Sequence, residues 1–491
     1  MNPVMMLVVI LLPILGGAIE ALLPFRKRVH REIYLELLVL INSLLVFALL
    51  INRPAQALAV VRFTGDWSIS LRVDGMSMVF GGLVAALWPL ATLYSFEYMK
   101  HEQREKTFFM FYTMTYGVTL GIALAEDMLT MYFFYELLTL VTVPLVLHTL
   151  KREAILAGRK YLYYSLGGAA FAFIGLIFLM VYGSTLNFTP GGVLDMGKIG
   201  NRTNILLLIY VFSFLGFGVK AAVCPFNSWL PQASVAPTPV TALLHAVAVV
   251  KSGAFAIIRL TFYCFGTEFL KGTWAQNVVM AVTMVTIIYG CSRAVKETHL
   301  KRRLAYSTIS NLSYILFGVT IMTPLGMAGA LCHMVFHAFM KICSFFCVGA
   351  VMYKTGRNYV HELDGFGRRM PKVFAIFTIS ALALMGVPGL AGFISKWNLA
   401  QAAVESGNVL AYFGIGALLL SALLTAIYML NIVVRAFFPA ADFDYETIQD
   451  VEDPNALMLV PLAVFAVVIV IFGLHSLPVV AFLQDVAAGV Y

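Results

Sequence analysis

Residues 216–246 read GFGVKAAVCPFNSWLPQASVAPTPVTALLHA, and this stretch decides the fold of the chain. Apolar segments flank it on both sides, and each is long enough to cross the hydrocarbon core as a helix, which takes about 20 residues. Pro225 has no N–H, so the carbonyl of Ala221 loses its helical donor. Irregular backbone persists at membrane depth only where protein buries it or where it lines a wet cavity. The stretch therefore predicts a membrane helix that breaks at Pro225, with Lys220 beside the break.

The composition points to the same class of protein. The chain has 491 residues, of which 61% are apolar and 12% charged, and its mean hydropathy is +0.88. A soluble domain is about half apolar and about one quarter charged. These values exclude a soluble enzyme, a disordered scaffold and a coiled coil. The net charge is +8, but the basic residues lie in short loops and form no basic domain, which excludes a nucleic-acid binder. An all-α polytopic membrane protein in a lipid bilayer remains.

Apolar segments of about 20 residues predict about fourteen transmembrane helices. An even number of crossings places both termini on one side of the membrane. Most Lys and Arg residues outside the spans follow odd-numbered helices, and such basic loops face the cytoplasm, so we expect both termini outside. The predicted spans are roughly 3–24, 33–51, 74–96, 107–125, 128–149, 159–183, 204–223, 238–262, 274–294, 302–321, 325–353, 373–395, 408–436 and 456–482.

Charged residues inside these spans are the first candidates for a functional site. A charge at the bilayer centre costs at least ~2.5–3.5 kcal/mol on insertion scales, so such residues usually face the protein interior and mark an ion path. Arg259 lies near the end of its helix, where it either faces the interior or extends to the interface. The candidates are Glu136, Lys220, Lys251, Arg259, Lys341 and Lys396.

A second break reads LMGVPGLAGFISKWNLA, residues 384–400. Pro388 and the glycines around it interrupt the helix shortly before Lys396. Two interrupted segments in corresponding positions of two halves favour an inverted-repeat transporter with its ion site at the breaks. The alternative is a proline kink that serves packing alone, but a kink does not require a lysine at either break.

Histidines add a further pattern within LCHMVFHAFMKICSFF, residues 331–346. His333, His337 and Lys341 are spaced at i, i+4 and i+8, so they share one helix face. Because histidine titrates near neutral pH, three such groups in line favour a proton relay over three isolated core residues. His245 lies six residues before Lys251, off its face, and is a ligand, a relay member or a packed imidazole.

The six cysteines form no metal-binding pattern. Cys343 and Cys347 are one helical turn apart, but two thiols without a matching pair do not make a zinc or iron–sulfur site. The sequence contains neither a glycine-rich phosphate loop nor a haem motif. We therefore expect no metal and no redox cofactor in this chain, and no redox chemistry of its own.

Several long motifs occur in order along nearly the whole chain. They are YELLTLVTVPLVL (135–147), the stretch around Pro225, LKRRLAYSTISNLSYILFG (300–318), HMVFHAFMKICSFFCVGAV (333–351) and ELDGFGRRMP (362–371). Together they resemble the antiporter-like, proton-conducting membrane subunits of the complex I superfamily, which are the L, M and N types of NADH–quinone oxidoreductase. The resemblance extends to subunits of Mrp Na+/H+ antiporters and of energy-converting membrane-bound hydrogenases.

The resemblance implies a fold of fourteen helices with two inverted five-helix repeats, helices 4–8 and 9–13, in which helices 7 and 12 are broken. The corresponding parts of this chain are the N-terminal helices over 1–106, the repeats over 107–262 and 274–436, and a last helix over 456–482.

The resemblance also implies a role for each candidate residue. Glu136 and Lys220 match a glutamate–lysine pair, Lys251 a central lysine, and Lys396 a terminal ion, with His333, His337 and Lys341 as the connection. A proton would pass from Lys220 to Lys251, then along His337, His333 and Lys341 to Lys396. The implied protein is a proton-translocating subunit of a redox-driven pump in a prokaryotic cytoplasmic membrane. Sister antiporter-like subunits and peripheral redox subunits would supply its energy.

Two features depart from particular types of subunit. M-type subunits have a glutamate where Lys396 stands, and the long lateral helix of L-type subunits is missing, since one span follows Pro439. The main alternative is a subunit of an Mrp-type Na+/H+ antiporter without redox subunits. Hard cations prefer oxygen ligands, which Glu136 and Asp127 could offer to sodium at one end of the path. A structural anchor does not need the basic residues, and a quinone-reducing site requires an electron donor that the chain does not show.

Overall fold

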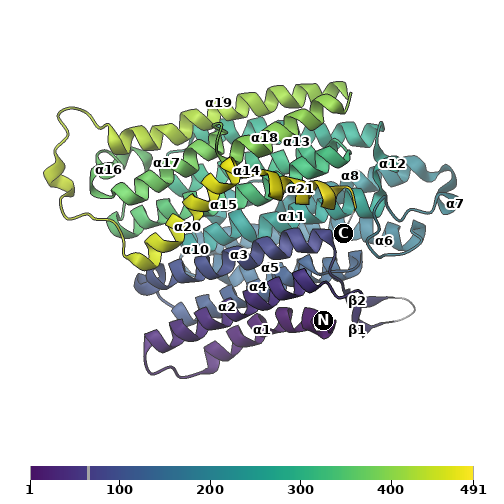
Figure 1. The fold of residues 1–491 in the computed structure, drawn as a ribbon, viewed down its shortest axis with the longest axis horizontal. Coiled ribbons are helices and arrows are strands. Elements are labelled where there is room, and N and C mark those ends of the chain that lie inside the picture. Colours follow the sequence, from purple (N-terminus) through teal and green to yellow (C-terminus); the bar gives the residue numbers. More distant parts are fainter. Residues whose placement is uncertain (1, 64–66, 490–491) are drawn as a thin grey trace.

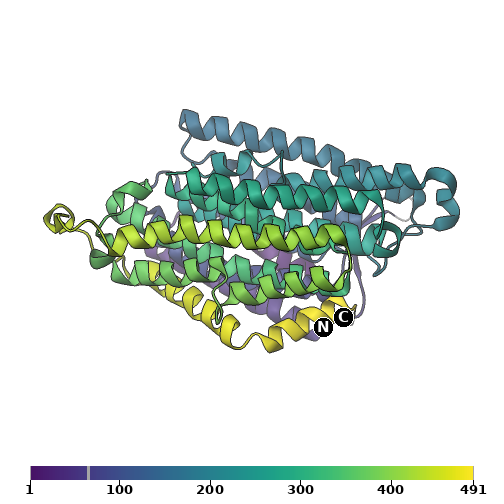
Figure 2. The same ribbon diagram turned by 90° about the horizontal axis from the view of Figure 1, so that it is seen from above.

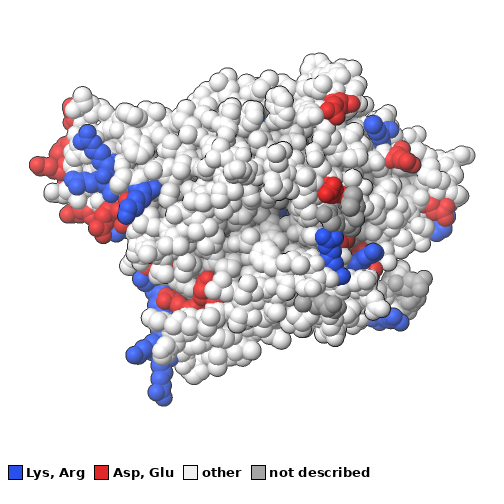
Figure 3. All heavy atoms as spheres, viewed as in Figure 1, with Lys and Arg blue, Asp and Glu red and all other residues white. Residues whose placement is uncertain are grey.

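The computed structural model describes residues 2–63 and 67–489 of this chain. Long helices run nearly parallel to one another along the long axis of the molecule (Figure 1). Within the described residues, eleven helices are long and apolar enough to cross a membrane. Lys, Arg, Asp and Glu side chains lie mostly at the two ends on the face that Figure 3 shows, and the band between them is largely uncharged. The chain is a multi-pass membrane protein, because this band matches a hydrocarbon layer.

The chain begins with a group of three long helices and one hairpin. The antiparallel hairpin lies between the second and third helices, where the sequence predicted only a connection. The Asp74 carboxylate accepts a hydrogen bond from Ser77 N and so caps the third helix. The elements are α1 (Val4–Leu22), α2 (Arg28–Asn52), β1 (Leu58–Arg62), β2 (Ser68–Leu71) and α3 (Gly75–Tyr98).

The next group contains the first break. α8 ends at Lys220 and the short helix α9 follows. A long helical segment then runs from α10 to η4, with π-helical turns at η3 and η4. The most apolar stretch of this segment, Thr238–Phe265, is completely buried. The elements are α4 (Glu105–Ala123), α5 (Met128–Val146), α6 (Arg152–Tyr182), α7 (Met196–Ile199), α8 (Thr203–Lys220), α9 (Trp229–Ala233), α10 (Thr238–Ala242), η3 (Leu243–Val247), α11 (Val249–Ile258), η4 (Arg259–Phe265) and α12 (Thr267–Leu270).

The third group contains the second break. The span predicted over 373–395 is divided, because Gly386 is left-handed (φ 92°) and Pro388 has no N–H for the carbonyl of Leu384. Its second half continues to Glu405. The elements are α13 (Trp274–Lys296), α14 (Leu300–Thr320), α15 (Pro324–Thr355), α16 (Phe366–Arg369), α17 (Pro371–Met385), α18 (Ala391–Glu405) and α19 (Val409–Phe437).

The chain ends with two helices instead of the single span predicted over 456–482. α20 (Ala456–Leu474) stops because Pro478 cannot donate to the carbonyl of Leu474, and α21 (Leu477–Ala487) follows. Figures 1 and 2 show this pair crossing the other helices and bringing the C-terminal end close to the N-terminal end. α20 packs against α3, α15 and α17, so it closes the bundle over its centre.

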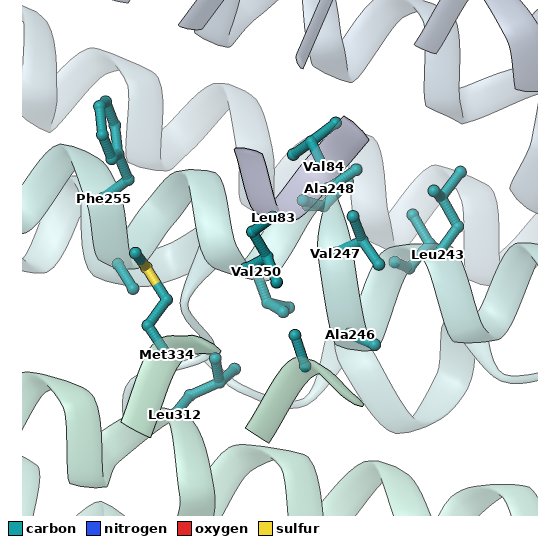
Figure 4. Packing of buried hydrophobic residues seen from close by; sticks show 14 of the residues in the cluster. Leu83, Val84, Leu243, Ala246, Val247, Ala248, Val250, Phe255, Leu312 and Met334 are labelled. Atoms are coloured by element: carbon teal, nitrogen blue, oxygen red, sulfur yellow. The ribbon is translucent and has the colours of Figure 1, made fainter. Parts of the chain in front are cut away.

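The core lies where α3, α11, α14 and α15 meet. Apolar side chains from all four elements interlock there, including Leu83, Val250, Leu312 and Met334 (Figure 4). α15 is almost entirely buried, as is the segment that carries Lys251. His245, Lys251, His333, His337 and Lys341 are therefore held on the two most deeply buried segments, whereas Lys220 and Lys396 lie on the less buried α8 and α18.

Candidate functional site

Lys220 and Glu136 form an ion pair beside the first break. Lys220 is the last residue of α8, and its Nζ lies 3.7 Å from Oε1 of Glu136 on α5. It also donates to the Tyr135 carbonyl and lies over the Tyr135 ring, 3.4 Å from the centroid. The Lys220 side chain is almost completely buried, whereas that of Glu136 is 24% exposed. With an effective dielectric near 20, the pair stabilises charged Lys220 by roughly 4 kcal/mol.

The backbone of the first break is held by side chains from neighbouring elements. Trp229 donates its indole N–H to the Val219 carbonyl at 2.8 Å, and Thr286 of α13 accepts from Cys224 N at 3.0 Å. The sequence suggested that Lys220 would lie beside the freed Ala221 carbonyl; its hydrogen bond goes to Tyr135 on α5 instead. α11 passes very close by, since a Cβ on Gly253 would lie 2.6 Å from Ala221 N. The helix that carries Lys251 therefore packs directly on the break.

Lys251 and His337 meet at the centre of the bundle. Nζ of Lys251 on α11 lies 2.7 Å from Nδ1 of His337 on α15, and both side chains are completely buried. Lys251 Nζ can donate to this imidazole when Nδ1 carries no proton, and a proton can be exchanged along the contact. The contact joins the two predicted repeats.

His333 continues from His337 toward the second break. The two rings lie 5.6 Å apart, and His333 Nδ1 is 2.9 Å from the Ser395 hydroxyl of α18. The Nε2 atoms of both histidines have no hydrogen-bond partner among the described residues. Buried polar groups nearly always have a partner, so these nitrogen atoms mark places for bound water.

Lys341 lies on the opposite side of His337 from Lys396. It is within electrostatic reach of Lys251 and His245, whereas His333 is within reach of Lys396. The order predicted from the sequence, with Lys341 last before Lys396, is therefore wrong. The reason is the direction of α15, along which His333, and not Lys341, lies nearest α18.

His245 occupies a π-helical turn between the first break and Lys341. Its Nε2 lies 3.4 Å from the Ser234 hydroxyl, and its ring lies 4.9 Å from that of Phe345. Nδ1 has no partner within the described part of the chain. His245 is within electrostatic reach of Lys341 and Lys301.

Lys396 interacts with the carbonyl end of a helix. Its Nζ donates to the Leu384 and Met385 carbonyls at 2.7 and 2.9 Å, and it lies 5.4 Å from the Tyr314 ring centroid. Pro388 leaves the Leu384 carbonyl without a donor, so the lysine takes the place of a helical N–H. The negative end of the α17 dipole also favours a cation here.

Two charged residues lie outside this line. Asp127 caps α5: its carboxylate accepts from Thr130 N at 2.7 Å and from the Ser70 hydroxyl at 2.6 Å. It lines a hollow of about 380 Å³ at the end of the molecule that carries the loops after even-numbered spans. Arg259 is completely buried and donates to both carboxylate oxygens of Asp74, the residue that caps α3, at 2.6 and 2.8 Å.

The sequence reasoning missed several polar residues. Glu20 and Glu36 lie inside the predicted spans 3–24 and 33–51, so the search for charges that found Glu136 should have included them. Asp74 is the first residue of the predicted span 74–96 and carries the same signal, but its pairing with Arg259, 185 residues away, does not follow from the sequence.

A hollow of about 640 Å³ was also missed. It lies at the end that carries the loops after odd-numbered spans, here called the basic end, and six of its lining residues are Glu102, His148, Val235, Ala236, His299 and Lys301. Lys301 donates to the Ala236 carbonyl at 2.8 Å. Burial, together with Lys301 and Arg302, lowers the pKa of His299 to about 4, so this imidazole is neutral at physiological pH. Five separate loops build the hollow, which is why sequence spacing does not reveal it.

Two known protein families match most of the chain. Residues 125–425 match the family described as NADH:quinone oxidoreductase/Mrp antiporter, TM. Residues 63–109 match the family described as NADH-Ubiquinone oxidoreductase (complex I), chain 5 N-terminus. The first of these covers both breaks and every residue of the line from Glu136 to Lys396.

Individual relatives extend the likeness. The chain is 31% identical over 386 residues to the NAD(P)H-quinone oxidoreductase chain 4 1 of Synechococcus sp. (strain JA-2-3B'a(2-13)), covering 76% of this chain and 70% of that one. It is 29% identical over 427 residues to the NADH-quinone oxidoreductase subunit N of Desulforudis audaxviator (strain MP104C), covering 84% and 83%. The two likenesses are nearly equal, so neither assigns a subunit type.

Solved structures show the same fold. A chain of the membrane-bound sulfane sulfur reductase, an archaeal respiratory membrane complex, superimposes with a TM-score of 0.85 at 21% identity, covering 100% of this chain and 98% of that one. A chain of the Mrp complex from Dietzia sp. DQ12-45-1b gives the same TM-score at 20% identity, covering 100% and 97%. The family match, the relatives and the shared fold agree, and the chain belongs to the NADH:quinone oxidoreductase/Mrp antiporter membrane family.

Proposed function

We propose that this chain is a proton-translocating, antiporter-like membrane subunit of a multisubunit, redox-driven ion pump. One observation carries the proposal: basic groups follow one another from Lys220 through Lys251, His337 and His333 to Lys396, all of them buried except the half-buried Lys396. Among the described residues, only the first of these groups pairs with a carboxylate. Placing several titratable groups at membrane depth is costly and has no structural purpose that apolar residues would not serve better.

In this scheme the charge state of one group changes that of the next. Glu136 holds a proton on Lys220, and loosening that pair lets the proton move to Lys251, which is in contact with His337. The proton then passes to His333 and, by way of the Ser395 hydroxyl, to Lys396. Water bridges the gaps, since the free Nε2 atoms of both histidines face no other partner among the described residues.

Protons reach this line from the hollow at the basic end. Val235 and Ala236 form part of its lining, and Ser234, the residue before Val235, contacts His245. His245 is within reach of Lys341, which interacts with Lys251. His245 and Lys341 are therefore the access branch, and Lys396 is the end at which a proton leaves.

The same proposal includes the finer architecture. Fourteen spans would form two inverted five-helix repeats, over 107–262 and 274–436, with Pro225 and Pro388 at equivalent breaks. The basic end would face the cytoplasm of a prokaryotic cell and both termini would lie outside, as the distribution of Lys and Arg favours. Asp127 would belong to the outer end, where a cation could approach the hollow that it lines.

The energy for pumping would come from other subunits. Glu136 and Lys396 lie at opposite ends of the line, and both are only partly buried, so they suit contacts with sister antiporter-like subunits. Peripheral redox subunits would drive the pump, and this chain would hold neither a metal nor a redox cofactor. The relatives named as quinone oxidoreductase subunits favour this assembly.

A second candidate is a subunit of an Mrp-type Na+/H+ antiporter without redox subunits. The observation in its favour is the Mrp complex chain, which matches the fold as well as the respiratory chain does.

Purification in mild detergent from the native membranes, followed by mass spectrometry, distinguishes the two assemblies. Co-purifying iron–sulfur subunits, with a nickel hydrogenase or quinone-site subunit, would support the redox pump. Co-purification with small membrane subunits alone, and with no metal cluster, would support the antiporter and contradict the redox assembly.

A further inference from the structure

A second group of polar side chains lies in the N-terminal helices, away from the line between Glu136 and Lys396; five are buried, and Glu36 is half-buried with one buried carboxylate oxygen. Glu36, Asn42 and Ser43 belong to α2, Trp88 to α3, and Tyr112 and Tyr116 to α4. Several of their polar atoms have no hydrogen-bond partner within residues 2–63 and 67–489: Glu36 Oε2, both amide atoms of Asn42, the Trp88 indole N–H and the Tyr112 hydroxyl. We call these six residues the α2–α4 polar file. The proton path described above uses none of them.

Contacts join the members of the file in sequence. Glu36 is within electrostatic reach of the Tyr112 hydroxyl. Tyr116 lies one helical turn beyond Tyr112, and its hydroxyl is 2.8 Å from the Ser43 hydroxyl, with Asn42 also beside it. The Trp88 ring stacks on Tyr116 with a centroid distance of 4.9 Å and contacts Tyr112 at 5.5 Å. The file is therefore continuous across three helices.

The file begins at charged residues of the basic end. Arg28, Glu32 and Glu36 are spaced at i, i+4 and i+8, so they lie on one face of α2. Arg28 bonds Glu32 at 2.7 Å, Glu105 at 2.5 Å and the Phe96 carbonyl at 2.6 Å, and its side chain is partly exposed. The rise from Arg28 to Ser43 is about 22 Å at 1.5 Å per residue, which reaches beyond the middle of the hydrocarbon core.

An apolar layer separates the file from Lys251. Leu83 and Val84 of α3 pack against Val247, Ala248 and Val250 (Figure 4). A proton on Glu36 therefore has no polar route to the central line through this part of α3.

We propose that α2, α3 and α4 enclose a second, blind inlet that binds a file of water molecules, opens at the basic end and delivers a proton to the Glu36 carboxylate. Its ligands are water and hydronium. Both polar atoms of the buried Asn42 amide lack a hydrogen-bond partner among the described residues, and such groups in proteins are bound by ordered water. The step is a proton transfer from hydronium to carboxylate, so no electrons are exchanged. The inlet is independent of the pump assignment.

Titratable and charged groups lie on the elements around Glu36. Tyr112 and, nearer the mouth, Glu105 lie on α4, while Arg28 and Glu32 lie on α2 itself. On the α1 side of α2, Glu20 is 3.7 Å from Arg31. On α3 the facing groups are the Trp88 indole and the Ser95 hydroxyl, neither of which titrates near neutral pH.

Radiolytic hydroxyl-radical footprinting of the intact complex tests for the water. Matched controls are Tyr94 and Tyr210, which are equally buried and hydrogen-bonded to the Phe346 carbonyl and the Thr261 hydroxyl. Because radicals form on bound water, Tyr112 and Tyr116 should be oxidised roughly tenfold faster than the controls. Asn42→Leu, which displaces water, should reduce that rate to the control value. Equal rates for all four tyrosines in the unaltered protein would overturn the proposal.

Infrared spectroscopy during a pH titration tests for the proton. The carbonyl band of a protonated, buried carboxylic acid should be lost in Glu36→Gln and kept in Glu405→Gln, which changes an exposed glutamate at the end of α18. An identical band in Glu36→Gln and the unaltered protein would show that Glu36 binds no proton and would overturn that part of the proposal.

Discussion

The two broken helices hold their lysines in different ways. At the first break, Lys220 ends α8 and faces a carboxylate, Glu136, at 3.7 Å. At the second, Lys396 lies beyond the break and returns to the carbonyl end of α17, and no carboxylate of the described residues pairs with it. A carboxylate can move away or take up a proton, whereas a helix end is a fixed dipole. Under the proposed function, this difference would make Lys220 a switch and Lys396 a static exit.

Replacing Lys220 should have the largest effect. Lys220→Met leaves Glu136 without its cation and removes the first proton carrier, so proton transport should fall about a hundredfold, within the range for loss of a proton-transfer group. The measurement is acidification of proteoliposomes that contain the assembled complex. Lys271→Met, at an exposed loop lysine, is the control and should transport normally.

Replacing Glu136 should have a smaller effect. Glu136→Gln keeps the shape of the side chain but removes roughly 4 kcal/mol of stabilisation from charged Lys220. Part of that loss is offset by the Tyr135 carbonyl and ring, so we expect transport to fall about tenfold. A rate equal to that of the unaltered complex in the same proteoliposome assay would show that the pair is not the switch.

Replacing Lys396 should be milder still. Lys396→Met leaves no carboxylate unpaired, and water can reach the carbonyls because the site is partly exposed. Transport should fall roughly fivefold, since water can still carry protons past the site. The melting temperature should stay at the value of the unaltered protein, in contrast to Lys220→Met. A large loss of stability in Lys396→Met would contradict the description of a static exit.

The second break should also be sensitive to a single methyl group. A Cβ on Gly392 would lie 1.8 Å from the Ala383 carbonyl oxygen, so Gly392→Ala forces α18 away from α17. We expect a loss of about 1–3 kcal/mol in stability, as for overpacked cores, and a moderate loss of transport. Gly416→Ala is the matched control, because its Cβ would meet no atom within 4 Å, and thermal unfolding should show no change for it.

Much of the fold could be predicted from the sequence because membrane crossing requires long apolar stretches. Pro225 and Pro388 located both breaks, since a missing N–H is visible in the sequence. The end of the seventh predicted span at Lys220, the division of the last span at Pro478 and the hairpin over 58–71 were not predicted, because they depend on local hydrogen bonds with little hydropathy signal.

The site was predictable residue by residue but not in its contacts. Helix spacing placed His333, His337 and Lys341 on one face, yet it could not give the direction of α15 relative to α18, and the predicted order was wrong. Arg259 and Asp74 lie far apart in the sequence, so their pairing depends on the tertiary fold. Glu36 is a charged residue inside the predicted span 33–51, so the sequence does carry a signal for it, but its neighbours on α3 and α4 depend on the tertiary fold.

The central claim is that protons cross the join between the two predicted repeats at Lys251 and His337. The most direct test is proton pumping by proteoliposomes that contain the assembled complex with Lys251→Met. The account predicts that pumping is lost while the complex remains assembled and its partner subunits stay bound. Full pumping by the assembled Lys251→Met complex would contradict it.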